Sequence, residues 1–196
     1  MKQRRHISAF TLIELLAVVV IIGVLMAIVF PAIIRAITDS EKVSVRQEVS
    51  AIERSISKFM TKYGSYPIDY KVFAATTTDV MLGGNDTSLA NTHIINNLTG
   101  TNVAANVIGI NGNPGMNNPE KERFMEFTEE RYDRRKHYID IWGQPYYIVI
   151  DFNNDNNLNF TLPNGGGPVV LKGRKAAVWS EGDPNDNPRN RIMSWD

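Results

Sequence analysis

The sequence contains no cysteine and only three histidines among its 196 residues. Without cysteine the chain has no disulfide, no thiolate metal ligand and no cysteine nucleophile. The histidines, His6, His93 and His137, do not lie at the short spacings that zinc and iron sites favour. These absences exclude disulfide scaffolds and disfavour a metalloenzyme.

The sequence also lacks an excess of charge, because 21 Lys and Arg residues balance 21 Asp and Glu residues. This balance removes the simplest case for a nucleic-acid-binding protein, although local patches survive it. No phosphate-binding loop, nucleophile motif or metal-binding helix pattern is present. The length fits one modest domain with an appendage, and the chain is not expected to be an enzyme.

Charge is missing altogether from residues 15–34, LLAVVVIIGVLMAIVFPAII, a run of 20 residues. Extended back to Phe10, the apolar stretch is interrupted only by Glu14. At about 1.5 Å rise per residue, a helix of this length crosses the roughly 30 Å hydrocarbon core of a bilayer. Residues 10–34 are therefore predicted to form one transmembrane helix, and the polar remainder a water-facing domain.

The residues before this run distinguish an anchor from an ordinary signal peptide. A secretory signal has an apolar core of about 7 to 15 residues, and the small-residue cleavage site follows it. Here the small residues Ser8 and Ala9 come before the apolar run, and a basic stretch at residues 2–5 precedes them. Cleavage between Ala9 and Phe10 removes the cationic leader, residues 1–9, and leaves the apolar helix on the mature chain.

Residues 8–15, SAFTLIEL, resemble the signature of type IV prepilins, in which a short basic leader ends in a small residue before FTLIEL. The resemblance implies that a prepilin peptidase cuts before Phe10 and methylates the new amine. Ala9 stands where the family usually has Gly, and its small side chain still fits. The resemblance also implies that Glu14 pairs with the N-terminal amine of a neighbouring subunit in a fibre.

Glu14 has a physical argument of its own. An unpaired carboxylate at the centre of a membrane helix costs about 2.5 kcal/mol or more. Because pairing neutralises both charges in a low-dielectric core, a subunit in the wrong register leaves two buried charges unpaired. The alternative is an interfacial side chain that simply reaches water.

Gly23 and Pro31 interrupt the otherwise uniform apolar run. Proline removes one helical hydrogen bond and Gly lowers helix propensity, so the section between them is weak. Both residues are also common in membrane helices. The resemblance implies an assembly role, because pilin helices loosen between such residues when they pack into a fibre.

The helix is predicted to continue through residues 35–63. The apolar residues recur there at spacings of three and four, as in an amphipathic helix: Val45, Val49, Ile52, Ile56, Phe59 and Tyr63. Gly64 and Pro67 then end the pattern. One helix from about Phe10 to Tyr63 is expected, its first half in lipid or fibre and its second half on a globular domain. A coiled-coil dimer is the rival interpretation of the stripe.

The rest of the chain divides into a variable, loop-rich region, 64–139, and a β-sheet region, 140–196. Short helices are expected from Ser88 to Leu98 and from Asn118 onward. Short apolar or alternating runs predict four antiparallel strands: 145–152, 169–172, 176–180 and 192–195. The fold class is α+β, with a pilin-like long N-terminal helix packed on a small antiparallel sheet.

Two further stretches resemble the major pseudopilins of type II secretion systems, residues 63–67, YGSYP, and residues 140–146, DIWGQPY. In the second stretch the aromatic residues Trp142 and Tyr146 are expected in the core where helix and sheet meet. The turn between them is expected to be shaped by two residues: Gly143 and Pro145.

The resemblance implies a non-catalytic subunit that polymerises with copies of itself and with minor pseudopilins. The implied partners are a prepilin peptidase, an inner-membrane assembly platform and its cytoplasmic ATPase. The chain is then a single-pass protein of the bacterial inner membrane, with a cytoplasmic N-terminus and a periplasmic C-terminal domain. It enters the fibre after assembly.

Major pseudopilins hold a calcium ion in their C-terminal loop, so the resemblance makes a structural calcium ion the candidate ligand, although no cofactor is required. One candidate set lies where the family holds its ion: Ser180, Asp183 and Asp186. Arg191 stands where related sequences usually carry an acid, and its own cation can cancel the site. A second set has the spacing of EF-hand positions 1, 3, 5 and 7: Asp151, Asn153, Asp155 and Asn157. A solvated, Asx-rich turn is the alternative for both loops.

A DNA-uptake fibre is an alternative function, as is a simple membrane-anchored binding domain. Cations and tyrosines alternate over residues 131–138, RYDRRKHY, and further cations follow at Lys172, Arg174, Lys175, Arg189 and Arg191. Bases stack on tyrosine while cations follow phosphates. Acidic residues crowd the first stretch, so a salt-bridged surface is favoured and nucleic acid is not an expected partner. The sequence does not separate a secretion pseudopilus from a motile pilus or a competence fibre.

Overall fold

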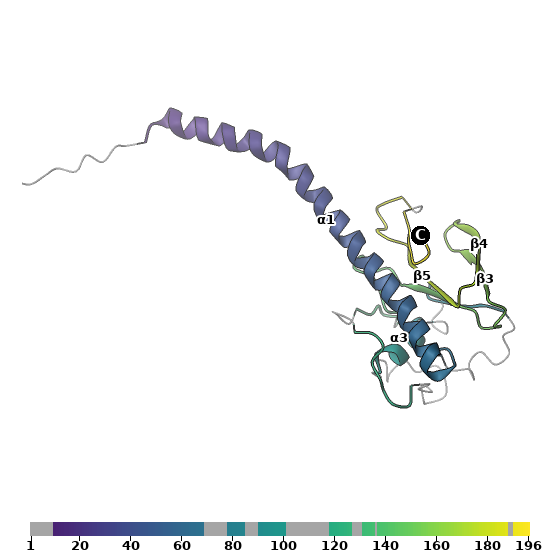
Figure 1. The fold of residues 1–196 in the computed structure, drawn as a ribbon. Coiled ribbons are helices and arrows are strands. Elements are labelled where there is room, and N and C mark those ends of the chain that lie inside the picture. The colour runs from purple at the N-terminus through teal and green to yellow at the C-terminus, as the bar shows by residue number, and fades with distance from the viewer. Residues whose placement is uncertain are drawn as a thin grey trace, which may run out of the picture. The chain divides into compact units, whose positions relative to one another are not determined.

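The computed structural model describes residues 10–68, 78–84, 90–100, 118–126, 131–135, 137–187 and 190–196. The chain falls into two compact units, residues 1–41 and 42–196, and each is described by itself. Helix α1 (Leu12–Tyr63) supplies residues to both. The remaining elements follow in order: β1 (Val80–Leu82), α3 (Thr92–Thr99), β2 (Tyr147–Ile150), β3 (Asn157–Leu162), β4 (Gly167–Lys172), β5 (Ala176–Ser180) and β6 (Ile192–Met193) (Figure 1).

The long N-terminal helix and the α+β class are confirmed. Residues 42–63 of α1 bury one apolar stripe in the second unit, and five of the predicted positions are 0% exposed: Val45, Val49, Ile52, Ile56 and Phe59. Tyr63 is partly buried against the same core. The spacing of three and four places these side chains on one face of the helix, where they bury their apolar area against the body.

The sheet of the second unit has the strand order β1-β2-β5-β6, and every neighbouring pair is antiparallel. Strands β3 and β4 form a separate antiparallel hairpin, with Asn157 opposite Lys172 and Leu162 opposite Gly167. Figure 1 shows this hairpin beside β5.

The central strands β2 and β5 are buried along their whole length because both faces of the sheet are covered. Ile148 and Val178 belong to the core that includes the stripe of α1. Their neighbours Val149 and Trp179 belong to a second core, with side chains of the β3–β4 hairpin. Successive side chains of a strand point to opposite faces, so helix, sheet and hairpin form three layers.

Two predicted short helices differ from the observed structure. Helix α3 starts at Thr92 after Asn91 and ends at Gly100, whose φ of 64° is left-handed. The predicted start at Ser88 is therefore too early, and Ser88 itself lies outside the described residues. The helix predicted from Asn118 is wrong over residues 118–126. Asn118 Oδ1 accepts the Glu122 N–H at 3.0 Å, so the side chain closes a turn instead of capping a helix.

Candidate functional site

Helix α1 begins with a hydrogen-bonded cap made by Thr11 and Glu14. The Glu14 carboxylate accepts the Thr11 backbone N–H at 2.9 Å and Thr11 Oγ1 at 2.7 Å. In return the Glu14 N–H donates to Thr11 Oγ1 at 3.3 Å. This reciprocal pattern is a capping box, which supplies acceptors to N–H groups that the first turn of a helix leaves without partners.

The capping box leaves part of the Glu14 carboxylate open. Both side-chain bonds end on Oε2, and no described residue donates to Oε1. The residue is exposed and lies about one helical turn after Phe10. One carboxylate oxygen of Glu14 is therefore available to a donor from another molecule.

The helix that follows Glu14 is apolar on every side. All large apolar side chains from Phe10 to Ile37 are between 45 and 82% exposed. Among the described residues, α1 is the one helix long and apolar enough to cross a membrane. Soluble monomers rarely expose contiguous apolar patches larger than a few hundred Å². The surface therefore indicates membrane anchoring.

Gly23 and Pro31 lie within this apolar section. A methyl group added to Gly23 meets nothing within 4 Å. Proline has no N–H to donate to the preceding turn, yet α1 continues without a break from Leu12 to Tyr63. Loosening between Gly23 and Pro31 in a fibre stays a prediction. Ala9, before the predicted cleavage bond, lies outside the described residues.

A tight turn at residues 140–144 leads into the central strand β2. The Asp140 N–H donates to Gln144 O at 2.8 Å, and the Gly143 N–H donates to Asp140 O at 3.1 Å. Gly143 has a φ of 80°, which glycine adopts without steric cost. Asp140 Oδ1 accepts the N–H groups of Trp142 and Gln144 at 2.9 and 2.8 Å, and Oδ2 accepts Ser180 Oγ at 2.5 Å. The carboxylate thus ties the turn to the end of β5.

Of the two aromatic residues of this stretch, Tyr146 lies in the core and Trp142 packs against its edge. Tyr146 is 0% exposed and stacks on Tyr138 with ring centroids 5.5 Å apart. Trp142 is partly buried against the same core. Pro145 faces Ile139 in an isolated antiparallel bridge. Their role in the described structure is packing and turn geometry.

Substitution of Asp140 is expected to destabilise the folded protein. We expect Asp140→Ala to lower the free energy of unfolding by about 2 to 4 kcal/mol, because three interior donors lose their acceptor. Asp140→Asn keeps an oxygen for the two backbone donors, so its loss should be smaller. Urea unfolding of the three proteins measures both losses, and an Ala variant within about 0.5 kcal/mol of wild type would contradict this role.

The Asp140 carboxyl is also expected to make the free energy of unfolding depend on pH. Burial raises the pKa of the Asp140 carboxyl, against the lowering effect of hydrogen bonds from Ser180, Gln144 and Trp142. The folded protein then binds this proton more readily than the unfolded chain. Its stability relative to Asp140→Asn should therefore increase as the pH falls from about 7 toward about 4.

The second calcium candidate, loop 151–157, has its oxygens occupied by its own backbone N–H groups and by a lysine. The fully buried Asp151 carboxylate accepts the N–H groups of Asp155 and Asn156, both at 3.0 Å. Lys175 Nζ lies 2.7 Å from Asp151 Oδ2. Asp155 Oδ1 accepts the Asn157 N–H at 2.7 Å, and Asn153 Oδ1 accepts the Asp155 N–H at 3.2 Å. The oxygens of this loop therefore serve an Asx-rich turn.

The three candidate ligands of the first set, near the C-terminus, have different partners. Ser180 Oγ donates to Asp140 Oδ2. Asp183 Oδ1 accepts the Asn185 N–H at 2.8 Å. Asp186 Oδ2 lies 2.9 Å from Lys42 Nζ, and hydrogen bonding to this ammonium is the largest of the effects that lower the pKa of the Asp186 carboxyl to about 2.

A metal ion bound by either loop needs several carboxylates grouped around one point. Within the described ranges, no group of three or more His, Asp or Glu side chains is placed to hold a metal ion. The acids of both loops instead face ammonium groups and backbone N–H groups. Their arrangement here does not fit a calcium site, and calcium binding stays a prediction from the resemblance.

Sequence reasoning missed the role of Glu48 on α1. Arg131 Nη2 donates to both Glu48 oxygens, at 2.6 and 2.8 Å, and the Tyr146 hydroxyl donates to Oε2. The Arg131 and Glu48 side chains are 21 and 20% exposed. No local signal marks this pair, because 83 residues separate its members.

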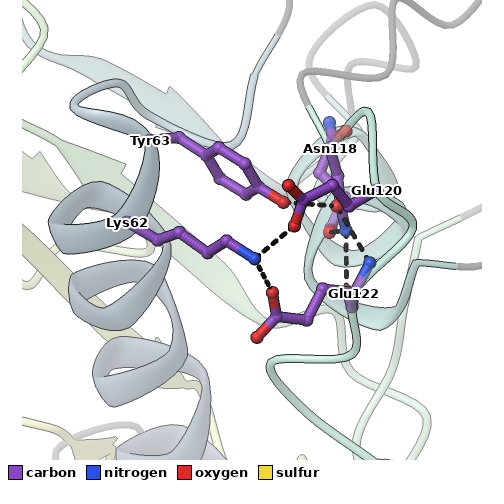
Figure 2. A network of polar contacts seen from close by, with 6 residues as sticks. Lys62, Tyr63, Asn118, Glu120 and Glu122 are labelled. Atoms are coloured by element: carbon purple, nitrogen blue, oxygen red, sulfur yellow. Dashed lines mark hydrogen bonds and ion pairs between the residues drawn. The ribbon is translucent and has the colours of Figure 1, made fainter.

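Figure 2 shows a further polar cluster at the C-terminal end of α1. Lys62 Nζ contacts the carboxylates of Glu120 and Glu122. The hydrogen bond to Glu120 has the largest effect on the pKa of Lys62, and both hydrogen bonds raise it. The Tyr63 hydroxyl donates to Asn118 Oδ1 at 3.2 Å. The cluster ties the last turn of α1 to residues 118–122.

Several cations of the DNA-uptake alternative face acids in the described structure. Four of them form ion pairs: Arg131 with Glu48, Arg174 with Glu53, Lys175 with Asp151 and Arg191 with Glu181. A cation already paired with a carboxylate contributes less to phosphate binding. Lys136 and Arg189 lie outside the described residues. The described part of the chain favours a salt-bridged surface.

Comparison with known proteins gives two similarities. The family model of the prokaryotic N-terminal methylation motif matches residues 4–30. The chain is 26% identical over 195 residues, 99% of both proteins, to the type II secretion system core protein G of Pseudomonas aeruginosa. No solved structure matches the chain significantly. The two similarities confirm the resemblance to type IV prepilins and to the pseudopilins of type II secretion systems.

Proposed function

We propose that this chain is a non-catalytic structural subunit of a type II secretion pseudopilus. In this proposal a prepilin peptidase cleaves the bond between Ala9 and Phe10 and methylates the new amine. The mature chain is held in the bacterial inner membrane by residues 10–34, with its C-terminal domain in the periplasm. It then polymerises with copies of itself and with minor pseudopilins.

The start of α1 carries the assembly part of the proposal, and the similarity to a type II secretion system core protein supports the secretion part. The Glu14 carboxylate takes part in the capping box at the start of α1, and the apolar side chains that follow it are exposed on every side of the helix. The methylation motif matches the same residues. A surface with one acid and no other charge through Ile34 suits both a bilayer and a bundle of identical helices.

Assembly exchanges one apolar environment for another. In the bilayer the helix contacts lipid, and in the fibre it contacts helices of neighbouring subunits. Lipid tails are as apolar as leucine, so this exchange gives little hydrophobic driving force. External work is therefore needed, which is the role proposed for an assembly platform and its ATPase. Pairing of Glu14 Oε1 with the Phe10 amine of a neighbour selects the register, because an offset subunit leaves both charges unpaired.

A deletion strain tests the proposed function. Loss of the gene should abolish export of the secreted proteins of the type II system, while twitching motility and transformation persist. Complementation with the wild-type gene is the control. Normal secretion combined with a loss of twitching or transformation would contradict the secretion role and favour a pilus or a competence fibre.

A further inference from the structure

Strands β5 and β6 are joined by the C-terminal loop, residues 181–191. The structure describes residues 181–187 and 190–191 of this loop. Near its two ends lie Glu181 and Arg191, which form the most deeply buried of the described ion pairs. Their side chains are 11 and 6% exposed. The Arg191 Nε donates to Glu181 Oε1 at 2.9 Å and to Oε2 at 3.1 Å. The pair therefore closes the C-terminal loop across its base.

The Glu181 carboxylate also collects donors from two other segments. Trp179 Nε1 on β5 donates to Oε1 at 3.1 Å. Asn164 Nδ2, in the turn between β3 and β4, donates to Oε2 at 3.3 Å. The carboxylate thus lies where β5, the hairpin turn and the C-terminal loop meet.

Arg191 reaches the hairpin turn as well. Its Nη2 donates to the Pro163 carbonyl oxygen at 2.7 Å. A methyl group added to Gly166 would lie 2.8 Å from Arg191 Nη1, so the turn packs closely on the guanidinium. One cation therefore holds a carboxylate and a backbone carbonyl from separate segments, which is the arrangement of oxygens that a calcium ion gathers.

The other acids of the C-terminal loop are satisfied within the chain. Asp183 caps Asn185, and Asp186 pairs with Lys42. A dication placed beside Glu181 would also lie next to the buried guanidinium of Arg191, and the two positive charges would repel each other. A guanidinium stays charged at every pH at which proteins fold, so this cation is permanent.

We propose that the Arg191 guanidinium takes the place of a metal ion in the C-terminal loop. The chain then carries its own cation at this position, and the loop closes without calcium. The inference rests on the contacts of residues 163–191, on the Lys42–Asp186 pair and on the metal position that the resemblance implies.

Thermal unfolding of the full-length chain in detergent micelles, followed by circular dichroism, tests this proposal. Wild-type Tm should shift by no more than about 1 °C between excess chelator and about 5 mM calcium, which saturates a weak extracytoplasmic site. A rise of about 4 °C or more with calcium would overturn the proposal.

Two variants of Arg191 extend the test. Arg191→Met leaves the Glu181 carboxylate buried without its cation, and Tm should fall by about 10 °C. Lys42→Met removes the half-buried pair with Asp186 in the same loop, which is more exposed than the Arg191–Glu181 pair, and this matched control should lose about 3 °C at most. Arg191→Asp should melt lower still in chelator and regain about 4 °C or more with calcium, since a second acid then faces Glu181.

The outcomes separate the proposal from a merely structural ion pair. If Arg191→Met melts like wild type, the guanidinium does not hold the loop. If calcium stabilises neither Arg191→Asp nor wild type, Arg191 does not stand at a metal position. If Arg191→Met does not fold, the calcium response of the wild-type chain still decides the question.

Discussion

Replacing Glu14 by Ala is expected to abolish fibres while leaving cleavage and membrane insertion intact. The variant keeps the apolar run at residues 15–34 and the small residue Ala9, so the peptidase substrate and the anchor persist. It loses the only acid of the apolar segment and the partner proposed for the amine at Phe10. Electron microscopy of sheared fibres, with immunoblots of the membrane fraction, measures the two effects separately. Fibres of normal number and length from Glu14→Ala would contradict the register role.

Glu14→Gln separates charge from capping. Its amide oxygen can still accept the Thr11 N–H, so the start of α1 is retained. Its neutral side chain cannot neutralise an amine, so fibres should be lost as in Glu14→Ala. Normal assembly of Glu14→Gln would show that the hydrogen bonds of the cap, and not the charge, are what Glu14 contributes.

Phe59→Ala should lower the free energy of unfolding by about 3 to 5 kcal/mol, the range for large aromatic to alanine changes in a core. Phe59 is 0% exposed, and its ring centroid lies 4.8 Å from that of Tyr63 and 5.1 Å from that of Phe124. The cavity opens between α1 and residues 118–126, so the loss should appear in the whole second unit. Urea unfolding of the full-length chain in detergent, followed by tryptophan fluorescence, measures it.

Tyr63→Phe is the matched control for this prediction. It keeps the ring and removes only the hydroxyl that donates to Asn118 Oδ1 at 3.2 Å. Its loss should be about 1 kcal/mol, the typical net value of one hydrogen bond. Equal losses in the two variants would mean that packing around Phe59 contributes no more than that bond.

Helix α1 was predictable because its two signals are local and strong. The charge-free run and the stripe from Val45 to Phe59 both extend over several helical turns, which single loop residues cannot imitate. The strands were harder to predict. Strand β1 has three residues, and β3, NLNFTL, begins in an asparagine-rich stretch, so neither stood out as an apolar run. The hairpin layer over the outer face of β2 and β5 was therefore missed.

The candidate sites also divide into those with a local sequence pattern and those without one. Glu14 and the turn at Gly143 were predictable because the residues that mark them lie within a few positions in the sequence. The capping box of α1 has a local signal too, because Thr11 and Glu14 follow the T-x-x-E pattern. Glu48 and Lys42 reach partners 83 and 144 residues away. Only the folded chain brings such partners together, so sequence spacing could not pair them.

Mass spectrometry of fibres sheared from cells that produce this chain with the secretion machinery tests the central claim most directly. A subunit that assembles through the N-terminus of α1 should be abundant in that fraction, beginning at N-methylated Phe10 and lacking residues 1–9. A chain that is absent from the fibre fraction and stays in the membrane with its leader attached would contradict the account.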